Sequence, residues 1–323
     1  MKELLEDLPN NKEIFESFLV AKSKMNNINY ENVLVAISGG SDSDIMLDII
    51  HRCDTEKKAK YIWFDTGLEY QATKDHLKYL EEKYGIEIIV GKPSKAIPIC
   101  CKEFGQPFLS KLVSEYIERL QRHNFKWEDR PFDELYKEYP NCKVALNWWC
   151  NGHGEGSKFN IERNKYLKEF MVANPPTFKI SNKCCKYAKK DIAKKYKKEN
   201  DIDLSVVGVR KSEGGARSSA YKNCFSTNDD VADEYRPIFW YKDDTKKVYE
   251  DYFNIQHSKC YSEYGLKRTG CSGCPYGRNF EFELEVLEKH EPKMYKAVTN
   301  IFKDAYEYTR KYRKFREEIK KGN

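Results

Sequence analysis

The chain has 323 residues, a net charge of +6, charged side chains at 33% of its positions and a mean hydropathy of −0.80. No apolar run approaches the roughly 20 residues that span a bilayer, and the acidic opening segment 1–7 lacks the apolar core of a signal peptide. These features exclude the membrane-spanning class and predict a cytoplasmic protein. The modest positive charge permits an anionic partner without demanding one.

The first third of the chain alternates short apolar runs, rich in β-branched residues, with segments of helical spacing. Such alternation predicts βαβ units, and therefore an α/β fold with a parallel twisted sheet flanked by helices. A helix is expected before the first strand. The expected helices cover 3–27, 44–50 and about 73–84, and the expected strands cover 33–37, 61–65 and 86–90.

The pattern breaks at Lys92-Pro93, and the next segment is irregular and contains several prolines. We interpret residues 94–178 as an insertion with one clear helix at 108–122. A lysine-rich helix near 184–198 and a strand at 204–209 then resume the α/β pattern. The predicted organisation is a nucleotide-binding half of the core (1–93), the insertion (94–178), a second part of the core with a cysteine cluster (179–280) and C-terminal helices (281–323).

The segment Ser38-Gly39-Gly40-Ser41-Asp42-Ser43 lies between an expected strand and an expected helix. Glycines let the backbone approach a phosphate closely, and a helix N-terminus offers unpaired N–H groups and positive charge. Asp42 cannot bind phosphate directly, but it could hold Mg²⁺ bridging to one. The alternative is an ordinary Ser/Gly turn. The predicted nucleotide contacts are Ser38, Gly39, Gly40, Ser41, Asp42 and Ser43.

This segment resembles the PP-loop of the ATP pyrophosphatases and of the phosphoadenosine phosphosulfate (PAPS) reductase family, which belong to the adenine nucleotide alpha-hydrolase-like superfamily. The sequence Phe64-Asp65-Thr66-Gly67-Leu68-Glu69 is similar to the family's next motif. Ligands bind at the carboxyl ends of strands in such sheets. The resemblance therefore implies an adenine nucleotide as ligand and Asp65 as a contact to the nucleotide or its metal. A turn or helix-cap role for Asp65 is the alternative.

Two cysteine pairs, Cys184-Cys185 and Cys271-Ser272-Gly273-Cys274, are separated by about 85 residues. Two thiolates on one tight loop can reach one metal or one edge of a cluster, so clustered cysteines in a reducing compartment suggest metal ligands. The spacing alone leaves zinc and iron–sulfur open, and buried apolar cysteines are a further alternative. The pairs resemble the pattern of the iron–sulfur adenylylsulfate (APS) reductases, which implies a 4Fe–4S cluster on Cys184, Cys185, Cys271 and Cys274.

Further segments follow the order of the same family. Val207-Gly208-Val209-Arg210, with Arg217 after it, looks like the family's anion-binding strand and loop, and the run 264–271 is similar to a later motif. Arginine suits bidentate contact with phosphate or sulfate, although surface ion pairs would explain these arginines equally well. With Asp42, the resemblance implies catalytic roles for Arg210, Arg217 and Arg268.

One departure concerns the reductase reaction, which uses a nucleophilic cysteine near the C-terminus. This chain has no cysteine after Cys274. The full Ser-Gly-Gly-x-Asp-Ser loop together with the cysteine pairs looks more like the iron–sulfur sulfurtransferases that modify nucleic acids. That resemblance implies ATP as a substrate that adenylates the acceptor, Mg²⁺, and a thiol or sulfur donor. A sulfonucleotide reductase and a non-catalytic nucleotide- or nucleic-acid-binding protein are the alternatives.

The basic charge concentrates in residues 179–198, which contain nine lysines and one acidic residue. Such a stretch can attract a polyanion, which would fit a nucleic-acid acceptor, but a solvated helix face explains it equally well. In the insertion, Trp148 and Trp149 could stack on a base, although packing is the preferred interpretation. A second metal site is conceivable on four cysteines and His153, in spacings that match no trusted pattern. The cysteines are Cys100, Cys101, Cys142 and Cys150.

Overall fold

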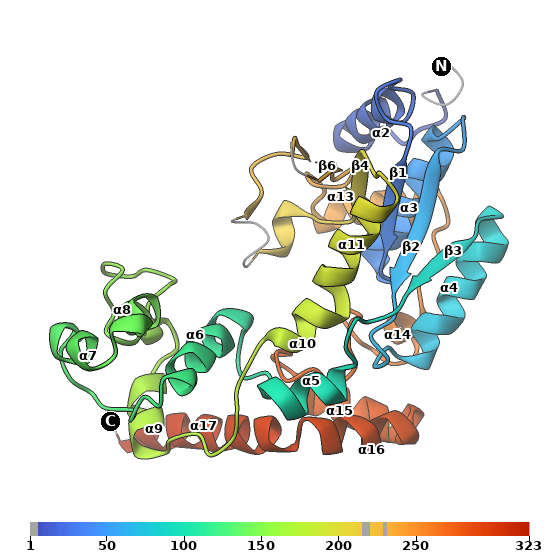
Figure 1. Ribbon diagram of the computed structural model, residues 1–323. Helices are drawn as coiled ribbons and strands as arrows, with labels where there is room; N and C mark the ends of the chain where they lie inside the picture. The colour runs from blue at the N-terminus through green and yellow to red at the C-terminus, as the bar shows by residue number, and fades with distance from the viewer. Residues whose placement is uncertain (1–5, 215–219, 229–230, 323) are drawn as a thin grey trace. The chain divides into compact units, whose positions relative to one another are not determined.

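The computed structural model describes residues 6–214, 220–228 and 231–322, which form two compact units (Figure 1). Unit 1 consists of residues 1–94 and 188–271, and unit 2 consists of residues 95–187 and 272–323. Each unit has a hydrophobic core of its own. The chain therefore alternates between the two units.

A six-stranded sheet forms the centre of the described part of unit 1, in the order β3-β2-β1-β4-β6-β5. Neighbouring strands are parallel except for β5, which runs antiparallel to β6. This mostly parallel sheet with flanking helices confirms the predicted fold class. The strands are β1 (Val33–Ile37), β2 (Ala59–Phe64), β3 (Ile88–Gly91), β4 (Leu204–Val207), β5 (Phe225–Ser226) and β6 (Asp233–Tyr235).

Helices cover both faces of this sheet, because successive side chains of a strand point to opposite faces. Val33 and Val35 of β1 pack in the main core with residues of α2 and α3, whereas Leu34 packs in a smaller cluster that includes Tyr196 of α11. The unit 1 helices are α2 (Lys12–Met25), α3 (Ser41–Cys53), α4 (Gln71–Tyr84), α11 (Asp191–Glu199), α13 (Asp243–Tyr252) and α14 (Lys259–Ser262), with a 3₁₀ turn at Lys211–Glu213.

Two of the predicted helices differ from the observed ones. Helix α2 begins at Lys12, because the side chain of Asn11 accepts a hydrogen bond from the N–H of Ile14 (3.1 Å) and so caps the helix there. The lysine-rich helix is interrupted. A short α10 (Lys183–Cys185) leads into a π-helical turn at Lys186–Lys190, and α11 follows.

Aromatic side chains dominate the core of unit 2. Trp148 and Trp149 are fully buried there, so they pack inside the unit, as preferred from the sequence. Tyr308 and Tyr312 of α17 enter the same core beside Phe170. The remaining helices are α5 (Ile97–Phe104), α6 (Lys111–Arg122), α7 (Phe132–Glu138), α8 (Lys143–Trp149), α9 (Leu167–Ala173), α15 (Phe280–His290), α16 (Pro292–Ile301) and α17 (Lys303–Gly322), with 3₁₀ turns at Pro140–Cys142 and Ile161–Arg163.

None of the helices in the described ranges combines the length and the apolar character needed to cross a membrane.

Candidate functional site

The predicted phosphate loop lies where the order of strands reverses in the sheet. The loop at residues 38–40 follows β1, and the segment Gly208–Arg210 follows β4, which is the parallel neighbour of β1. From β1 the chain proceeds to β2 and β3 on one side and returns to β4 on the other. Ligands of open α/β sheets bind at such switch points, outside the carboxyl ends of the strands.

Two glycines permit the close packing around this loop. Gly39 has φ +67°, and a Cβ atom there would lie 2.7 Å from the side chain of Thr73. Gly208 passes the first turn of α3 so closely that a Cβ atom would lie 3.2–3.3 Å from backbone atoms of Asp42 and Ser43. A larger residue at Gly39 would push the loop away from Thr73, and a larger residue at Gly208 would push its segment away from the first turn of α3.

Hydrogen bonds within the loop fix its shape. The N–H of Ser38 donates to Oγ of Ser43 (2.9 Å), and the N–H of Gly40 donates to Oγ of Ser38 (3.3 Å). The N–H of Ser41, the first residue of α3, donates to the hydroxyl of Tyr261 (3.0 Å). The N-terminus of α3 is therefore capped by a side chain from a segment 220 residues away.

Asp42 is held by two cations. Its Oδ2 accepts a hydrogen bond from Nε of Arg210 (2.9 Å), and its Oδ1 lies 2.8 Å from Nζ of Lys246. Burial opposes ionisation of this carboxyl, but Lys246 and Arg210 outweigh it and lower the pKa of Asp42. Both carboxylate oxygens are thus already in contact with a cation of the chain itself.

The same two cations connect the loop to α13. Arg210 is largely buried and also donates to Asp243 (2.8 Å) and to the hydroxyl of Ser212 (3.1 Å). Lys246 contacts Oγ of Ser41 as well as Asp42. Cationic groups from β4 and from α13 therefore converge on the first turn of α3.

A buried charge network begins two residues farther along α3, at Asp44. Oδ2 of Asp44 contacts Nε2 of His76 (3.0 Å) and Nδ1 of His257 (2.7 Å), and Nε2 of His257 contacts Glu250 (2.8 Å). Burial disfavours the charged imidazole, but the two carboxylates outweigh it and raise the pKa of His257 to about 9. Burial likewise opposes ionisation of Asp44, and the two histidines nevertheless lower its pKa. Protonated His257 thus balances the buried Asp44 carboxylate.

Asp65 follows β2 and has the turn role that the sequence left open. Its Oδ1 accepts a hydrogen bond from the N–H of Gly67 (2.8 Å). The neighbouring Thr66 donates to the buried carboxylate of Glu69 (2.7 Å) and lies 3.4 Å from Sγ of Cys271. Burial raises the pKa of Glu69, although Lys189 lies 3.5 Å from it. Cys271 therefore lies against the predicted second motif within unit 1.

The other three predicted metal ligands, Cys184, Cys185 and Cys274, belong to unit 2, where a further thiol, Cys101, lies beside Cys184. Cys184 of α10 is within hydrogen-bonding reach of Cys101 on α5 and of Cys185, and Cys274 is close enough to act on its charge. The contact with Cys101, aided by burial, raises the pKa of Cys184. Sequence reasoning gave Cys101 no role in this group, because it precedes Cys184 by more than 80 residues.

In residues 6–214, 220–228 and 231–322, no three or more His, Cys, Asp or Glu side chains lie in an arrangement that could hold a metal ion. The predicted cluster therefore rests on the pattern of thiols. The other two predicted arginines stay predictions. Arg268 is exposed, and Arg217 lies outside the described residues.

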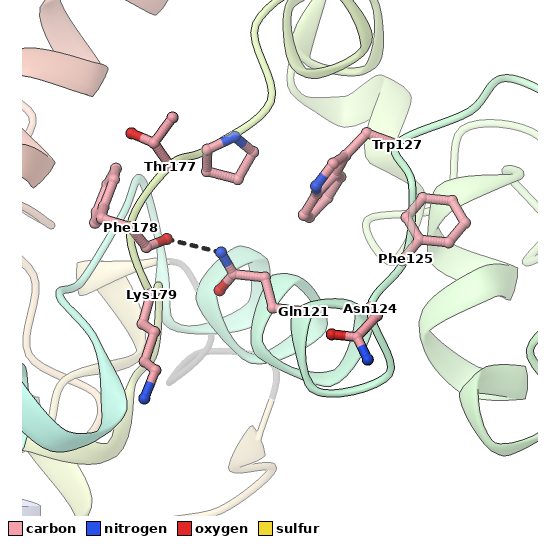
Figure 2. Close-up of a pocket in the computed structure, with 8 residues that line it drawn as sticks. Gln121, Asn124, Phe125, Trp127, Thr177, Phe178 and Lys179 are labelled. Atoms are coloured by element: carbon pink, nitrogen blue, oxygen red, sulfur yellow. Dashed lines mark hydrogen bonds between the residues drawn. The ribbon is translucent and has the colours of Figure 1, made fainter.

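A cavity of about 280 Å³ lies in unit 2 between the end of α6 and the segment that leads to α10. Figure 2 shows the indole of Trp127 on one wall, with Gln121 and Asn124 across the floor. The carboxamide of Gln121 is occupied, since it donates to the carbonyl of Phe178 (2.7 Å) and accepts from the N–H of Ile180 (2.9 Å). No predicted site residue lines this cavity.

The sequence alone did not single out several residues of the loop region. Lys246, Tyr261 and His257 reach the loop from segments more than 200 residues away. No local motif marks these residues. The available signal was the resemblance of the run 264–271 to a later motif of the family.

Comparison with known proteins supports the interpretation of the loop. Residues 32–113 match the family model of the phosphoadenosine phosphosulfate reductase domain. An uncharacterized protein of Methanocaldococcus jannaschii, MJ0066, is 25% identical over 290 residues, which cover 90% of this chain. The chain spans 45% of the length of that relative.

Several solved structures are similar at low identity. A PAPS reductase from Candida auris in a phosphate complex has a TM-score of 0.43 at 15% identity, covering 84% of this chain and 93% of that one. The U34-tRNA thiolase NcsA from Methanococcus maripaludis with its [4Fe-4S] cluster has a TM-score of 0.40 at 14% identity, covering 94% and 80%. The NH₃-dependent NAD synthetase of Campylobacter jejuni has a TM-score of 0.38 at 12% identity, covering 92% and 94%.

The family match includes the loop Ser38–Ser43 and the motif around Asp65, which are the segments that carry the resemblance to the PP-loop enzymes. Over residues 32–113, the chain is thus similar to the phosphoadenosine phosphosulfate reductase domain.

Proposed function

We propose that this protein is an enzyme that binds ATP at Ser38–Ser43 and adenylates an acceptor oxygen, which prepares the acceptor for sulfur transfer. The observation that carries the proposal is the convergence of Arg210 and Lys246 on the first turn of α3, at the switch point of a parallel sheet. A polyphosphate needs positive charge at such a position. The family match over this segment supports the same ligand.

The proposed reaction has two steps. In the first, an oxygen of the acceptor bonds to the α-phosphorus of ATP, and the bond from that phosphorus to the bridging oxygen of the β-phosphate breaks to release pyrophosphate. In the second, a sulfur nucleophile bonds to the acceptor carbon, and AMP leaves with the acceptor oxygen. Arg210 and Lys246 would stabilise the charge that develops on the leaving pyrophosphate. Mg²⁺ would arrive with the nucleotide and add to this charge stabilisation.

We further propose that Cys184, Cys185, Cys271 and Cys274 hold an iron–sulfur cluster. The chemistry of the donors fits, because thiolates are the usual ligands of such clusters and three of these thiols gather in unit 2. When bound, a 4Fe–4S cluster could carry electrons or a sulfur atom. Zinc is the alternative metal for four thiolates. Counting iron and sulfide in anaerobically purified protein separates the two.

A nucleic acid is the proposed acceptor class. The π-helical turn and α11 contain seven lysines between residues 186 and 198, and α11 has no buried residue. Five of these lysines are exposed and therefore available to a polyanion: Lys186, Lys190, Lys194, Lys195 and Lys198. A thiol or a persulfide would donate the sulfur. The oligomeric state stays outside the proposal.

The first experiment is a nucleotide assay on anaerobically purified protein with Mg²⁺ and a thiol. ATP, APS and PAPS are supplied separately, with and without bulk tRNA or DNA, and pyrophosphate, AMP and sulfite are measured. Pyrophosphate from ATP, increased by one nucleic acid, supports the proposal and identifies the acceptor. The Asp42→Ala variant should lose this activity, and Lys247→Gln, at an exposed position of α13, should keep it.

Sulfonucleotide reduction is the second candidate, and the family match over residues 32–113 favours it. Sulfite from APS or PAPS, with no pyrophosphate from ATP, would replace the first proposal by this one. A non-catalytic binding protein predicts nucleotide binding without any product, and biological activity that survives Asp42→Ala.

A further inference from the structure

The polar groups that would meet a phosphate at the loop are already occupied by the chain itself. The hydroxyl of Tyr261 accepts the N–H of Ser41 at the start of α3 (3.0 Å), and the ammonium of Lys246 contacts Oγ of Ser41 and the carboxylate of Asp42. The segment of Tyr261 also lies over Gly40, where an added Cβ would be 3.3 Å from the hydroxyl and 3.0 Å from Oγ1 of Thr269. One tyrosine and one lysine thus occupy the anion-binding face of the loop.

We infer that Tyr261 is an internal stand-in for a phosphate of the nucleotide, whereas Lys246 is a cation held at the site to bind that phosphate, so the two side chains have opposite effects on nucleotide binding. Tyr261 competes with the phosphates for the N–H of Ser41 and must leave when they arrive. Lys246 stays at the site, and its ammonium group replaces its contact with Oγ of Ser41 by a contact with a phosphate oxygen. This inference rests on the proposed function, because it concerns the regulation of the same nucleotide site.

The two side chains differ in what they offer to an anion. The tyrosine hydroxyl acts as acceptor toward Ser41, which is the part that a phosphate oxygen would take, so only one of the two can be bound there. The lysine has three N–H donors and no acceptor, so it can keep Asp42 while it contacts a phosphate. Its ammonium is mostly buried, with Glu250 at 3.6 Å, and is therefore held near the loop.

The position of His257 explains how the tyrosine is kept over the loop. The imidazole of His257 contacts the Tyr261 ring edge to face, with 5.8 Å between the ring centres, and is itself fixed by Asp44 and Glu250. Movement of Tyr261 therefore does not require the buried Asp44 network to break, since only a ring contact joins the two.

Equilibrium binding of AMP-PCP with Mg²⁺ to the full chain, measured by calorimetry, tests the inference with two variants and two matched controls. Tyr261→Phe keeps the ring and removes the competing hydroxyl, so the affinity should rise about threefold, as one ordinary hydrogen bond allows. Lys246→Gln should lower the affinity about tenfold or more, because a charge-assisted phosphate contact is lost. Lys247→Gln and Tyr252→Phe, on exposed positions of α13, should match the unaltered chain.

The remaining outcomes each overturn a defined part. Weaker binding by Tyr261→Phe, or binding by both variants equal to that of the unaltered chain, overturns the stand-in while leaving the nucleotide site intact. Absence of AMP-PCP binding by the unaltered chain overturns the proposed function and this inference with it. The thermal unfolding temperature of each variant is the folding control. If it equals that of the unaltered chain, a change in affinity does not come from misfolding.

Discussion

The two units differ in what they bury. In the described residues, every buried ionisable Asp, Glu, His or Arg side chain belongs to unit 1, whereas the buried polar side chains of unit 2 are all uncharged. Unit 2 instead buries aromatic rings and thiols. Burying a charge costs free energy unless a partner compensates it, so a chain concentrates such charges where they serve binding or chemistry. The proposed nucleotide site lies in unit 1, with the buried charges, and three of the four proposed cluster ligands lie in unit 2.

Two carboxylates of unit 1 are paired with cationic or imidazole groups. Asp42 lies between two cations, and Asp44 lies between two histidines. The uncharged polar groups buried in unit 2 are Ser114, Asn160, Ser181, Ser272 and Thr309.

The largest expected effect concerns the thiols. If Cys184 holds the proposed cluster, Cys184→Ser should remove nearly all bound iron from anaerobically purified protein, because a serine hydroxyl is a poor ligand for iron–sulfur clusters. Iron and sulfide per chain, with the broad visible absorption of the cluster, provide the measurement. Cys100→Ser is the matched control on α5, since Cys100 contacts the carbonyl of Lys95 rather than Cys184. Equal iron content in Cys184→Ser and Cys100→Ser would contradict the proposal that Cys184 is a cluster ligand.

The next effect tests whether aromatic packing stabilises unit 2. Trp149 is fully buried and donates a hydrogen bond to the carbonyl of Glu128 (2.9 Å). Trp149→Ala should therefore lower the free energy of unfolding by about 4 kcal/mol, through lost burial and a cavity. Denaturant-induced unfolding measures this loss. Trp240→Ala, at a half-exposed position of unit 1, should cost far less, and a similar cost in both variants would contradict the contrast.

Gly105 tests the backbone of unit 2. Its φ of +117° and ψ of 164° are open almost only to glycine, and a Cβ there would lie 2.3 Å from the carbonyl oxygen of Lys179. Gly105→Ala should lower the free energy of unfolding by about 3 kcal/mol, since strain and overpacking add. Gly154→Ala, with φ +82° and open space around it, should cost about 1 kcal/mol. The same unfolding measurement compares them, and equal losses would mean that the contact with Lys179 costs nothing.

The smallest effect is a pH dependence from the charge network of unit 1. The pKa of His257 is raised from 6.5 to about 9, so its stabilising contribution is complete below about pH 6.5 and is lost as the pH rises through 9. Between these values the unaltered chain should lose about 1–2 kcal/mol more than His257→Gln, after allowance for partial solvent screening. Unfolding at pH 6 and pH 9.5 tests this. His153→Gln, at an exposed position of unit 2, should retain the full pH dependence.

The sequence predicted the parts of this site that are local in the chain. The strand at Val33–Ile37 and the loop that follows it could be predicted, because each is determined by residues that are neighbours in the sequence. The strand is marked by apolar and β-branched residues, and the loop is marked by glycines and serines. Arg210 was predicted from the resemblance of its segment to the family's anion-binding strand and loop. Its partner Lys246 was not, because nothing in the sequence distinguishes the one lysine that reaches Asp42 from the many exposed ones. Contacts across 200 residues depend on the packed fold.

The cysteines illustrate the same limit. The spacing of Cys271 and Cys274 was visible in the sequence, but the approach of Cys101 to Cys184 depends on how α5 packs against α10. Asp65 shows a different limit, because an aspartate at the end of a strand is equally expected as a ligand and as a turn residue. Its hydrogen bond from the N–H of Gly67 shows a turn role, and the contact of Asp65 to a nucleotide or metal stays a prediction.

The carboxamide of Gln106 joins distant parts of the chain within unit 2. It donates to Asp304 (2.8 Å) and accepts from the N–H of Ala305 (2.9 Å), while the backbone of Gln106 pairs with residues 179–181. The aromatic core needs Tyr312 from the same helix. During synthesis, therefore, the helices made from residue 95 onward cannot close their core until α17 has left the ribosome. In the meantime they expose apolar surface, which favours aggregation.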